Sequence, residues 1–514
     1  MRVLILLSCL LALNAADRIN HAGRILPDTP VVTTPTLFNT PEADAVMATL
    51  QLMPADYAGN EDISDYPLLP NSNAMIAQIE AGFDTRWGTG TAWRYDLRGF
   101  FEMNWVLIPD NQPLQDIELI WYPDESDEVI DPQNGIARYP IPDNMPIETW
   151  PINTGGLSLY DWQRDINGDD GDRHSIVLQP GTGDYWETWT CKRLAPSSDP
   201  EWQAANLAKW NINSRALRPL GWTSADAAGL PMLPHVVRYD EVQRGEIEHA
   251  IRMIVYRTRK AYLYPATHYA SVPETFDPDI PAMGERLRLK ASFVIPPNWS
   301  EEAKCVARAF KRYGGIVADN GSFMSFSIAP DDRWPAGCFD DLRDIKVSDF
   351  EVVDAFGETE GPRAANPPTV DAGSDRAVSM QQGADLNAIV GGGSGPLSYS
   401  WYVYPHVTQP GTVTFSDDTA TSTTASFSAP GDYIIMFTAD DGSHTPVYDA
   451  VYLHVVDGPV RDVDLSWAAP GATFDVLVDD VLHSTVSTPS VTINDLDGSQ
   501  DHSFAVVTVA GGNG

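Results

Sequence analysis

The sequence has few cysteines and few basic residues for its length. Four cysteines occur in 514 residues, and 33 Lys and Arg stand against 71 Asp and Glu, which gives a net charge of -38. Such a surface repels phosphate backbones and anionic lipids, so the composition argues against nucleic acid as a partner. Beyond the N-terminus no apolar run approaches the roughly 20 residues that a membrane-spanning helix needs. We therefore expect no membrane span.

The first 16 residues have the pattern of a secretory signal peptide. A basic residue, a short apolar run and then small residues precede Asp17. We therefore expect an exported protein, either extracellular or on the cell surface. Export permits a disulfide, and among Cys191, Cys305 and Cys338 the predicted pair is Cys305 with Cys338. No pair of these cysteines has the spacing of a cysteine zinc site.

Composition shifts predict a mainly β protein, in which a β-rich N-terminal α+β domain is followed by two Ig-like β-sandwich modules. A stretch rich in Gly, Pro and charge, AFGETEGPRAANPPT at 355–369, separates the domain from the modules. The expected segments are a signal peptide (1–16), a main domain (17–354), a linker (355–366), a first module (367–458) and a last module (459–514).

The first module resembles a PKD domain. Leu397, Tyr399, Trp401 and Val403 alternate with polar neighbours, as in a half-buried strand. The segments that carry the resemblance are PTVDAGSDRAV (368–378), SYSWYV (398–403), TVTFSD (412–417), TTASFSAPGDYIIMFTADDG (423–442) and VYLHVVDG (451–458). The resemblance implies an Ig-like sandwich that acts as a spacer or as a contact with proteins or polysaccharides, without catalysis.

The last module is similar to a fibronectin type III domain over VDLSWAAPGATFDVLVDDVLHSTV (463–486) and TINDLDGSQDHSFAVVTVAGG (492–512). Trp467 stands at the place of the core tryptophan. His502 stands near the place where the family has a corner tyrosine, and a last strand is missing. An unpaired sandwich edge exposes backbone groups, so we expect either a fragment or completion by another segment.

The main domain has the mixed pattern of antiparallel β structure with a few helices. An amphipathic helix is expected over 300–313, where Ser300 is a suitable N-cap and Phe310 lies on the apolar face. Little regular structure is expected before residue 70. Strands are expected at 101–108, 117–121, 174–178, 249–256, 261–264, 286–295, 324–328 and 350–353.

Aromatic and acidic clusters suggest binding sites in the main domain. Tryptophans are dense there, and exposed indole rings stack on sugar rings, although most tryptophans fill cores. The group that could include such a platform is Trp121, Trp162, Trp186, Trp189, Trp202, Trp210 and Trp222. A Gly-broken acidic loop places oxygen ligands at Asp165, Asn167 and Asp169, which predicts either calcium or a solvated turn. We predict no other cofactor.

Candidate catalytic side chains lie at expected strand ends and turns. His174 leads into a strand and Glu187 follows the next turn, so a hairpin of that length brings the two together as a candidate acid/base pair. For any single histidine the alternative is a hydrogen-bonded structural role. The hypothesis takes His174, His249 or His268 as acid or base, Glu187, Asp226 or Asp319 as carboxylate partner, and Arg252 or Lys290 as the cation that neutralises substrate charge.

The same region resembles a widespread set of secreted bacterial proteins, to which the resemblance attaches no activity. The segments that carry it include DRHSIVL (172–178), SRALRPLGWTSADAAGLPMLPHVVRYDEV (214–242), EHAIR (248–252), YLYPATHYAS (262–271), MGERLRLKASF (283–293), KRYGGIVADNGS (311–322) and SDFEVVD (348–354). Such proteins often carry Ig-like or carbohydrate-binding modules.

Export, tryptophan density and polar clusters at strand ends favour a secreted carbohydrate-active protein, either a hydrolase or a lyase of an extracellular polysaccharide or cell-surface glycan. In a lyase the cations would stabilise an enolate beside a uronate carboxylate. The alternatives are a non-catalytic surface protein that binds glycans or proteins, and a metalloenzyme that uses the histidines. The enzymatic hypothesis requires the candidate side chains to meet in one site.

Overall fold

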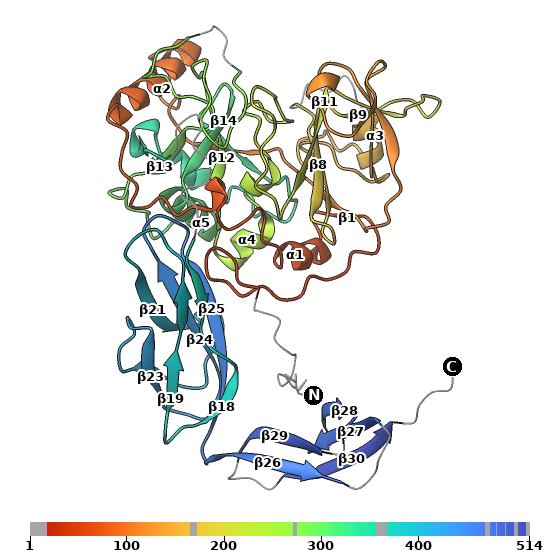
Figure 1. The fold of residues 1–514 in the computed structure, drawn as a ribbon. Helices are drawn as coiled ribbons and strands as arrows, with labels where there is room; N and C mark the ends of the chain where they lie inside the picture. The colour runs from red at the N-terminus through yellow and green to blue at the C-terminus, as the bar shows by residue number, and fades with distance from the viewer. Residues whose placement is uncertain are drawn as a thin grey trace. The chain divides into compact units, whose positions relative to one another are not determined.

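The computed structural model describes residues 18–164, 172–270, 275–355, 367–467, 473–479, 481–488, 490–497 and 502–509. The protein is mainly β, as predicted (Figure 1). It forms two compact units: an N-terminal unit over Leu26–Arg363, and a C-terminal unit that combines residues 364–514 with the segment up to Ile25. Residues 18–25 therefore belong to the C-terminal unit, whereas the sequence placed them in the main domain. No helix among the described residues is long and apolar enough to cross a membrane.

One six-stranded mixed sheet forms the centre of the N-terminal unit. Residues that alternate in and out of its core explain why these segments are strands: Ile251, Met253 and Val255 face the core, and Arg252 points to the opposite face. The strand order is β16 (Phe350–Val352), β13 (Arg286–Leu289), β14 (Gly315–Asn320), β12 (Ile251–Val255), β15 (Ser325–Ile328) and β2 (Arg98–Phe101).

Two five-stranded sheets complete the β structure of this unit. The first contains β1 (Thr36–Leu37), β3 (Val106–Leu107), β7 (Ser175–Gln179), β8 (Asp184–Trp189) and β11 (Asn206–Asn211) in that order. The second contains β5 (Val129–Asp131), β6 (Ile136–Tyr139), β4 (Gln115–Leu119), β10 (Trp202–Ala204) and β9 (Lys192–Arg193).

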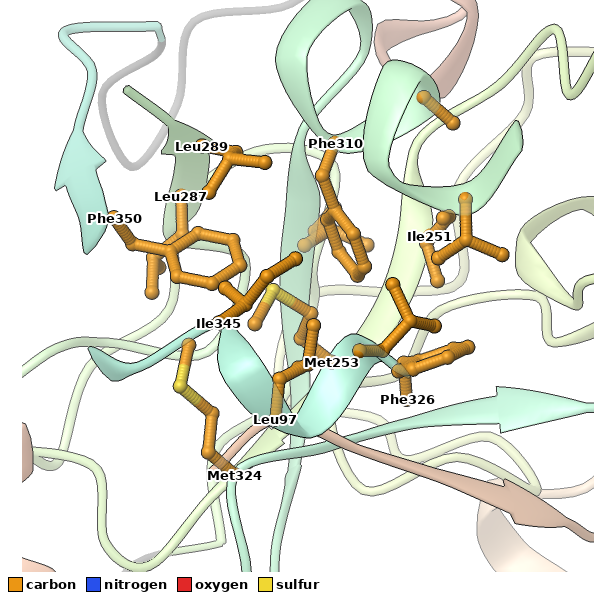
Figure 2. Close-up of a cluster of buried hydrophobic side chains, with 14 of the residues drawn as sticks. Leu97, Ile251, Met253, Leu287, Leu289, Phe310, Met324, Phe326, Ile345 and Phe350 are labelled. Carbon is orange, nitrogen blue, oxygen red and sulfur yellow. The ribbon is translucent and has the colours of Figure 1, made fainter. Parts of the chain in front are cut away.

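Helices cover the sheets. The predicted helix is α5 (Glu301–Arg312), and the Ser300 hydroxyl accepts a hydrogen bond from the backbone N–H of Ala303, as an N-cap does. Its Phe310 packs edge-on against Phe326 and Phe350 of the central sheet, in the core drawn in Figure 2. The other helices are α1 (Pro41–Met47), α2 (Ser72–Trp87), α3 (Leu159–Arg164) and α4 (Tyr239–Arg244).

Three local predictions for this unit were wrong. The single strand expected at 101–108 is two strands, β2 and β3, which belong to different sheets. No strand forms at 261–264, where Tyr262 makes an isolated bridge with Met283 and Pro265, which has no backbone N–H, follows. Helix α1 falls in the region before residue 70 where little regular structure was expected; α2, which begins at Ser72, was not predicted, although it carries Met75, Ile79 and Phe83 at helical spacing.

The predicted disulfide is also wrong. Cys191, Cys305 and Cys338 are free, buried thiols. Cys305 lies on the buried face of α5, and burial raises the pKa of its thiol to about 12. These cysteines therefore act as small apolar side chains in the core.

The C-terminal unit contains two groups of strands. The first group forms the sheets β17 (Thr369–Asp371) with β20 (Ile389–Gly391), β18 (Arg376–Ser379)–β25 (Val447–Val456)–β24 (Gly431–Asp440)–β21 (Ser398–Val403), and β19 (Ala384–Asn387)–β23 (Ser422–Phe427)–β22 (Val413–Phe415). Side chains from the larger two sheets share one core, which contains the fully buried Trp401. The linker expected at 355–366 lies outside the described residues, except for Ala355.

The second group pairs β26 (Val460–Ser466) with β29 (Ser490–Asp497), and places β27 (Thr473–Val478) between β28 (Val481–Val486) and β30 (Phe504–Val509). Trp467 packs edge-on against Phe474, with 5.3 Å between ring centroids. The likenesses to PKD and fibronectin type III domains remain predictions.

The N-terminal segment 18–25 packs on the first strand group. The backbone N–H of Ile25 donates to the Tyr404 hydroxyl at 3.1 Å, and Ile19 and Ile25 join an apolar cluster with Met436. Because residues 26–363 lie between this segment and the strands that it contacts, the chain enters the C-terminal unit twice.

Candidate active site

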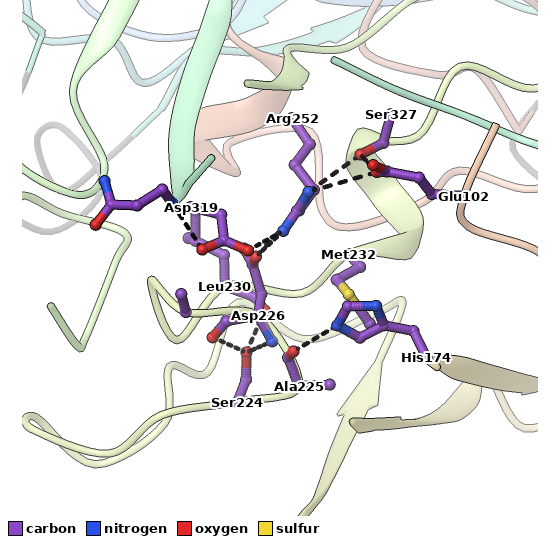
Figure 3. A network of polar contacts seen from close by, with 12 residues as sticks. Glu102, His174, Ser224, Ala225, Asp226, Leu230, Met232, Arg252, Asp319 and Ser327 are labelled. Atoms are coloured by element: carbon purple, nitrogen blue, oxygen red, sulfur yellow. Dashed lines mark hydrogen bonds and ion pairs between the residues drawn. The ribbon is translucent and has the colours of Figure 1, made fainter. Parts of the chain in front are cut away.

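A buried arginine gathers three carboxylates on the face of the central sheet that is turned away from its core (Figure 3). Arg252 donates to Asp226 Oδ1 from both Nε, at 3.0 Å, and Nη2, at 2.7 Å. The same Nη2 donates to Asp319 Oδ2 at 3.0 Å, and Nη1 lies 3.9 Å from Glu102 Oε2. We call Glu102, Asp226, Arg252 and Asp319 the Arg252 cluster. It unites three of the side chains that were singled out in the sequence.

Strand register brings these groups together. Ser327 of β15 accepts a hydrogen bond from Arg252 Nη1 at 3.1 Å and donates one to Glu102 Oε2 at 2.9 Å. The pairing of β12 with β14 shifts after Met253, so that Asp319 lies opposite Ile254. Such irregularities re-aim side chains, and here the Asp319 carboxylate reaches the guanidinium.

The carboxyl groups of the cluster hold their protons more tightly than usual. Burial, and then the negative charge of Glu148, raise the pKa of Glu102 to about 7. Burial raises the pKa of Asp226 to about 6, although Arg252 opposes this. Burial also raises the pKa of Asp319, again against the effect of Arg252. The side chains of Glu102 and Asp319 are 20% and 24% exposed, so solvent reaches both.

Asp226 lies deepest in the cluster. Its side chain is 1% exposed, and its Oδ2 atom has no hydrogen-bond partner. The loop before it is held by Ser224, whose hydroxyl accepts from the Asp226 N–H at 2.9 Å and donates to the Leu230 carbonyl at 2.6 Å. Asp226 therefore orients Arg252 from the buried side of the cluster, whereas Glu102 and Asp319 lie on the side that solvent reaches.

His174 is held as a charged structural group. Its Nδ1 lies 2.9 Å from Glu148 Oε2, and its Nε2 lies 3.0 Å from the carbonyl oxygen of Ala225. Both partners are pure acceptors, so both bonds require a doubly protonated ring. Burial acts to lower the pKa of His174, but the charge and hydrogen bond of Glu148 outweigh it and raise the pKa to about 9. The imidazolium ties β7 to the loop that carries Asp226.

Glu187, the predicted partner of His174, is a buried structural carboxylate on β8. It accepts hydrogen bonds from the backbone N–H groups of Met232 and Leu233 and from Trp210 Nε1. Burial raises its pKa to about 7, although these backbone bonds oppose the shift. With every bond directed inward, Glu187 holds the 232–233 segment and does not pair with His174.

The remaining candidates have other partners. His249 Nε2 lies 3.2 Å from Glu241 of α4, in a separate buried network with Arg238. Lys290 donates to the Ser348 carbonyl beyond the end of β13. The structure therefore does not bring these two into the Arg252 cluster, because each lies just outside a strand and bonds other neighbours.

His268 is close to the cluster loop and partly exposed. Its Nδ1 donates to the Ala227 carbonyl at 2.8 Å, and its ring stacks on Tyr269. No described residue bonds its Nε2.

Glu102 was missed in the sequence. It directly follows β2, so it carried the strand-end signal used for the other candidates, but the expected 101–108 strand placed it inside a strand. Only the pairing of β2 with β15 aligns it with Ser327 and Arg252.

The predicted calcium ligands Asp165, Asn167 and Asp169 lie outside the described residues. Elsewhere, in the part of the chain that the structure describes, no group of three or more His, Cys, Asp or Glu side chains could hold a metal ion.

Most of the predicted tryptophan platform is core. Trp162 and Trp202 are fully buried, and Trp186 and Trp210 nearly so. Trp121 is 55% exposed, and its ring meets Trp189 edge-on at 5.2 Å. Trp189 is half-buried, so this pair is a partly exposed aromatic surface on the N-terminal unit.

Comparison with known proteins adds little. No protein family model matches the chain, and no curated protein matches it significantly. Among solved structures, a match is found with a nucleoside hydrolase-related hypothetical protein from Saccharophagus degradans that is associated with carbohydrate metabolism. The identity is 19% and the TM-score 0.17, over 29% of this chain and 36% of that chain. At this TM-score the likeness carries no functional argument.

Proposed function

We propose that the N-terminal unit is a glycoside hydrolase that acts on an extracellular polysaccharide, with Glu102 as general acid and Asp319 as base or nucleophile. The observation that carries the proposal is the Arg252 cluster, in which one buried guanidinium holds a pair of solvent-reachable carboxyl groups from different strands. Glycoside hydrolases need such a pair, roughly 5 to 10 Å apart, on either side of the scissile bond.

The two carboxyl groups differ in the way that this chemistry requires. A pKa of about 7 keeps a large fraction of Glu102 protonated near neutral pH, as a proton donor to the leaving oxygen must be. Burial raises the pKa of Asp319 too, but Arg252 and the Asn320 N–H, which donates to it at 2.7 Å, oppose that shift. After burial, the largest influence on Glu102 is the negative charge of Glu148 and that on Asp319 is the positive charge of Arg252, and this difference assigns Glu102 as acid and Asp319 as base or nucleophile.

Hydrolysis is favoured over β-elimination because Arg252, the cation of the cluster, is already engaged. A lyase needs a cation that binds a uronate carboxylate and the developing enolate. Every terminal nitrogen of Arg252 already contacts Asp226, Asp319, Ser327 or Glu102. Arg252 therefore serves as a positioning residue, together with Asp226.

The test is turnover of Glu102→Gln and Asp319→Asn on a panel of soluble polysaccharides, measured as reducing ends released. We expect each variant to lose about 10²- to 10⁴-fold in turnover, the usual contribution of a general acid or base. Glu42→Gln, at an exposed position on α1, is the matched control and should keep full activity. Unchanged turnover in both cluster variants would refute the assignment.

A non-catalytic glycan-binding protein is the second candidate, and the partly exposed Trp121–Trp189 pair supports it. Under this alternative the wild-type protein binds a polysaccharide of the panel and releases no reducing ends. Trp121→Ala then weakens binding, whereas the carboxylate variants do not.

A further inference from the structure

A cationic and aromatic surface lies beside the Arg252 cluster, on a chain whose net charge is -38. Arg98 of β2 lies over two neighbouring rings, with its guanidinium carbon 4.7 Å from the centroid of Trp93 and 4.6 Å from that of Phe323; the two ring centroids are themselves 5.8 Å apart. The ring of Phe100 packs against that of Phe323, with 5.7 Å between the ring centroids, and Trp93 is 39% exposed. We call Trp93, Arg98, Phe100 and Phe323 the Arg98 cluster.

Arg98 has donors but no acceptor among the described residues. Its Nε is buried without a hydrogen-bond partner, and no described group accepts a bond from the rest of its side chain. The nearby Asp96 is paired with Lys346 Nζ at 2.6 Å. Burial, and then the charge of Arg343, lower the pKa of Arg98. The charge of Asp96 opposes this shift, but no described carboxylate bonds Arg98, and a partly desolvated cation without a bonded acceptor favours an incoming anion.

The Arg98 cluster and the Arg252 cluster share one sheet face. Arg98, Phe100 and Glu102 alternate along β2 and its extension, so they point to the same side. Phe100 lies opposite Ser327, which bonds both Glu102 and Arg252. At about 3.3 Å per residue, Arg98 and Glu102 are separated by roughly 13 Å, the span of a short oligosaccharide.

We propose that the Arg98 cluster is a binding subsite for an anionic substituent, a carboxylate or a sulfate ester, on a polysaccharide whose chain continues to Glu102 and Asp319. The guanidinium, held against the two rings, presents the N–H donors of its Nη atoms to the anion as a fork. The exposed face of Trp93 stacks on the sugar that carries the anion. That the polysaccharide continues from the Arg98 cluster to Glu102 and Asp319 rests on the proposed function, whereas the anion site itself does not.

The probes are dextran sulfate, polygalacturonate and unmodified dextran, and the measurement is retardation of the full-length protein in native gels that contain each polymer. Dextran and dextran sulfate form a matched pair that differs in the sulfate ester alone. Because a protein of charge -38 is repelled by polyanions, retardation by one reports a local site rather than bulk charge.

We expect the wild-type protein to be retarded by dextran sulfate or polygalacturonate and not by dextran. Retardation by dextran sulfate indicates a sulfate site, and retardation by polygalacturonate indicates a carboxylate site. Arg98→Met should weaken this binding at least about tenfold. Arg98→Lys keeps the charge but not the two-pronged donor geometry, so its affinity should lie between those of wild type and Arg98→Met. Arg138→Met removes an exposed arginine of another sheet and should bind as wild type.

Three results would overturn the proposal: no retardation by either polyanion, equal retardation by dextran, or unchanged binding by a folded Arg98→Met protein. If Arg98→Met does not fold, Arg98→Lys and Trp93→Ala replace it, and unchanged binding in both has the same meaning. Glu102→Gln should bind normally. Unchanged turnover in Glu102→Gln would count against the proposed hydrolase alone. Unchanged polyanion binding in Arg98→Met would count against the anion site alone.

Discussion

Replacement of His174 should remove a pH dependence from the stability of the N-terminal unit. The folded protein holds this ring between Glu148 and the Ala225 carbonyl, which raises its pKa from 6.5 to about 9. A raised histidine pKa stabilises the folded state fully below the unfolded pKa, and the stabilisation is lost as the pH rises through the folded pKa. The loss should therefore fall between pH 6.5 and about 9.

The size of the effect follows from the shift. At 1.36 kcal/mol per unit, the difference between 6.5 and 9 corresponds to about 3 kcal/mol, of which about 2 kcal/mol is lost between pH 7 and 9.5. The raised pKa values of Glu102, Asp226 and Glu187 are about 6 to 7, so these groups titrate mainly below that window. The free energy of unfolding of wild type should fall by about 2 kcal/mol more than that of His174→Gln over pH 7 to 9.5.

Urea denaturation followed by tryptophan fluorescence provides the assay, because 13 of the 15 tryptophans lie in residues 26–363. His406→Gln, at an exposed position in the C-terminal unit, controls for loss of a histidine as such. Glu148→Gln should move the wild-type loss to lower pH, because it removes the charge that raises the pKa. Parallel pH profiles for wild type and His174→Gln would refute the imidazolium assignment.

Three further results are expected. Hydrolysis should decline as the pH rises through about 7, where Glu102 loses its proton, and a rate that keeps rising past pH 8 would exclude Glu102 as the acid. Glu187→Gln should lower the free energy of unfolding by about 1 to 3 kcal/mol, since an amide cannot accept all the N–H groups that the carboxylate accepts; an unchanged urea midpoint would contradict this. Thiol titration of the protein unfolded without reductant should find Cys305 and Cys338 both reactive, and reductant should leave Tm unchanged.

Local patterns in the sequence were sufficient where structure depends on neighbours along the chain. Helix α5 has its N-cap, its apolar face and its charged ends within 14 residues, so periodicity and capping located it. Strands β7, β12, β15 and β16 were found from short apolar runs of strand-forming residues. The mainly β class follows from the same signals.

The candidate site was decided by tertiary structure. Arg252 meets Asp226 across 26 residues and Asp319 across 67, and Ser327 meets Glu102 across 225. Strand register, and the register shift between β12 and β14, bring these residues into contact, and no local sequence pattern encodes either. For the same reason the sequence contained Asp226, Arg252 and Asp319 as candidates but could not separate them from His249 and Lys290, which bond other neighbours.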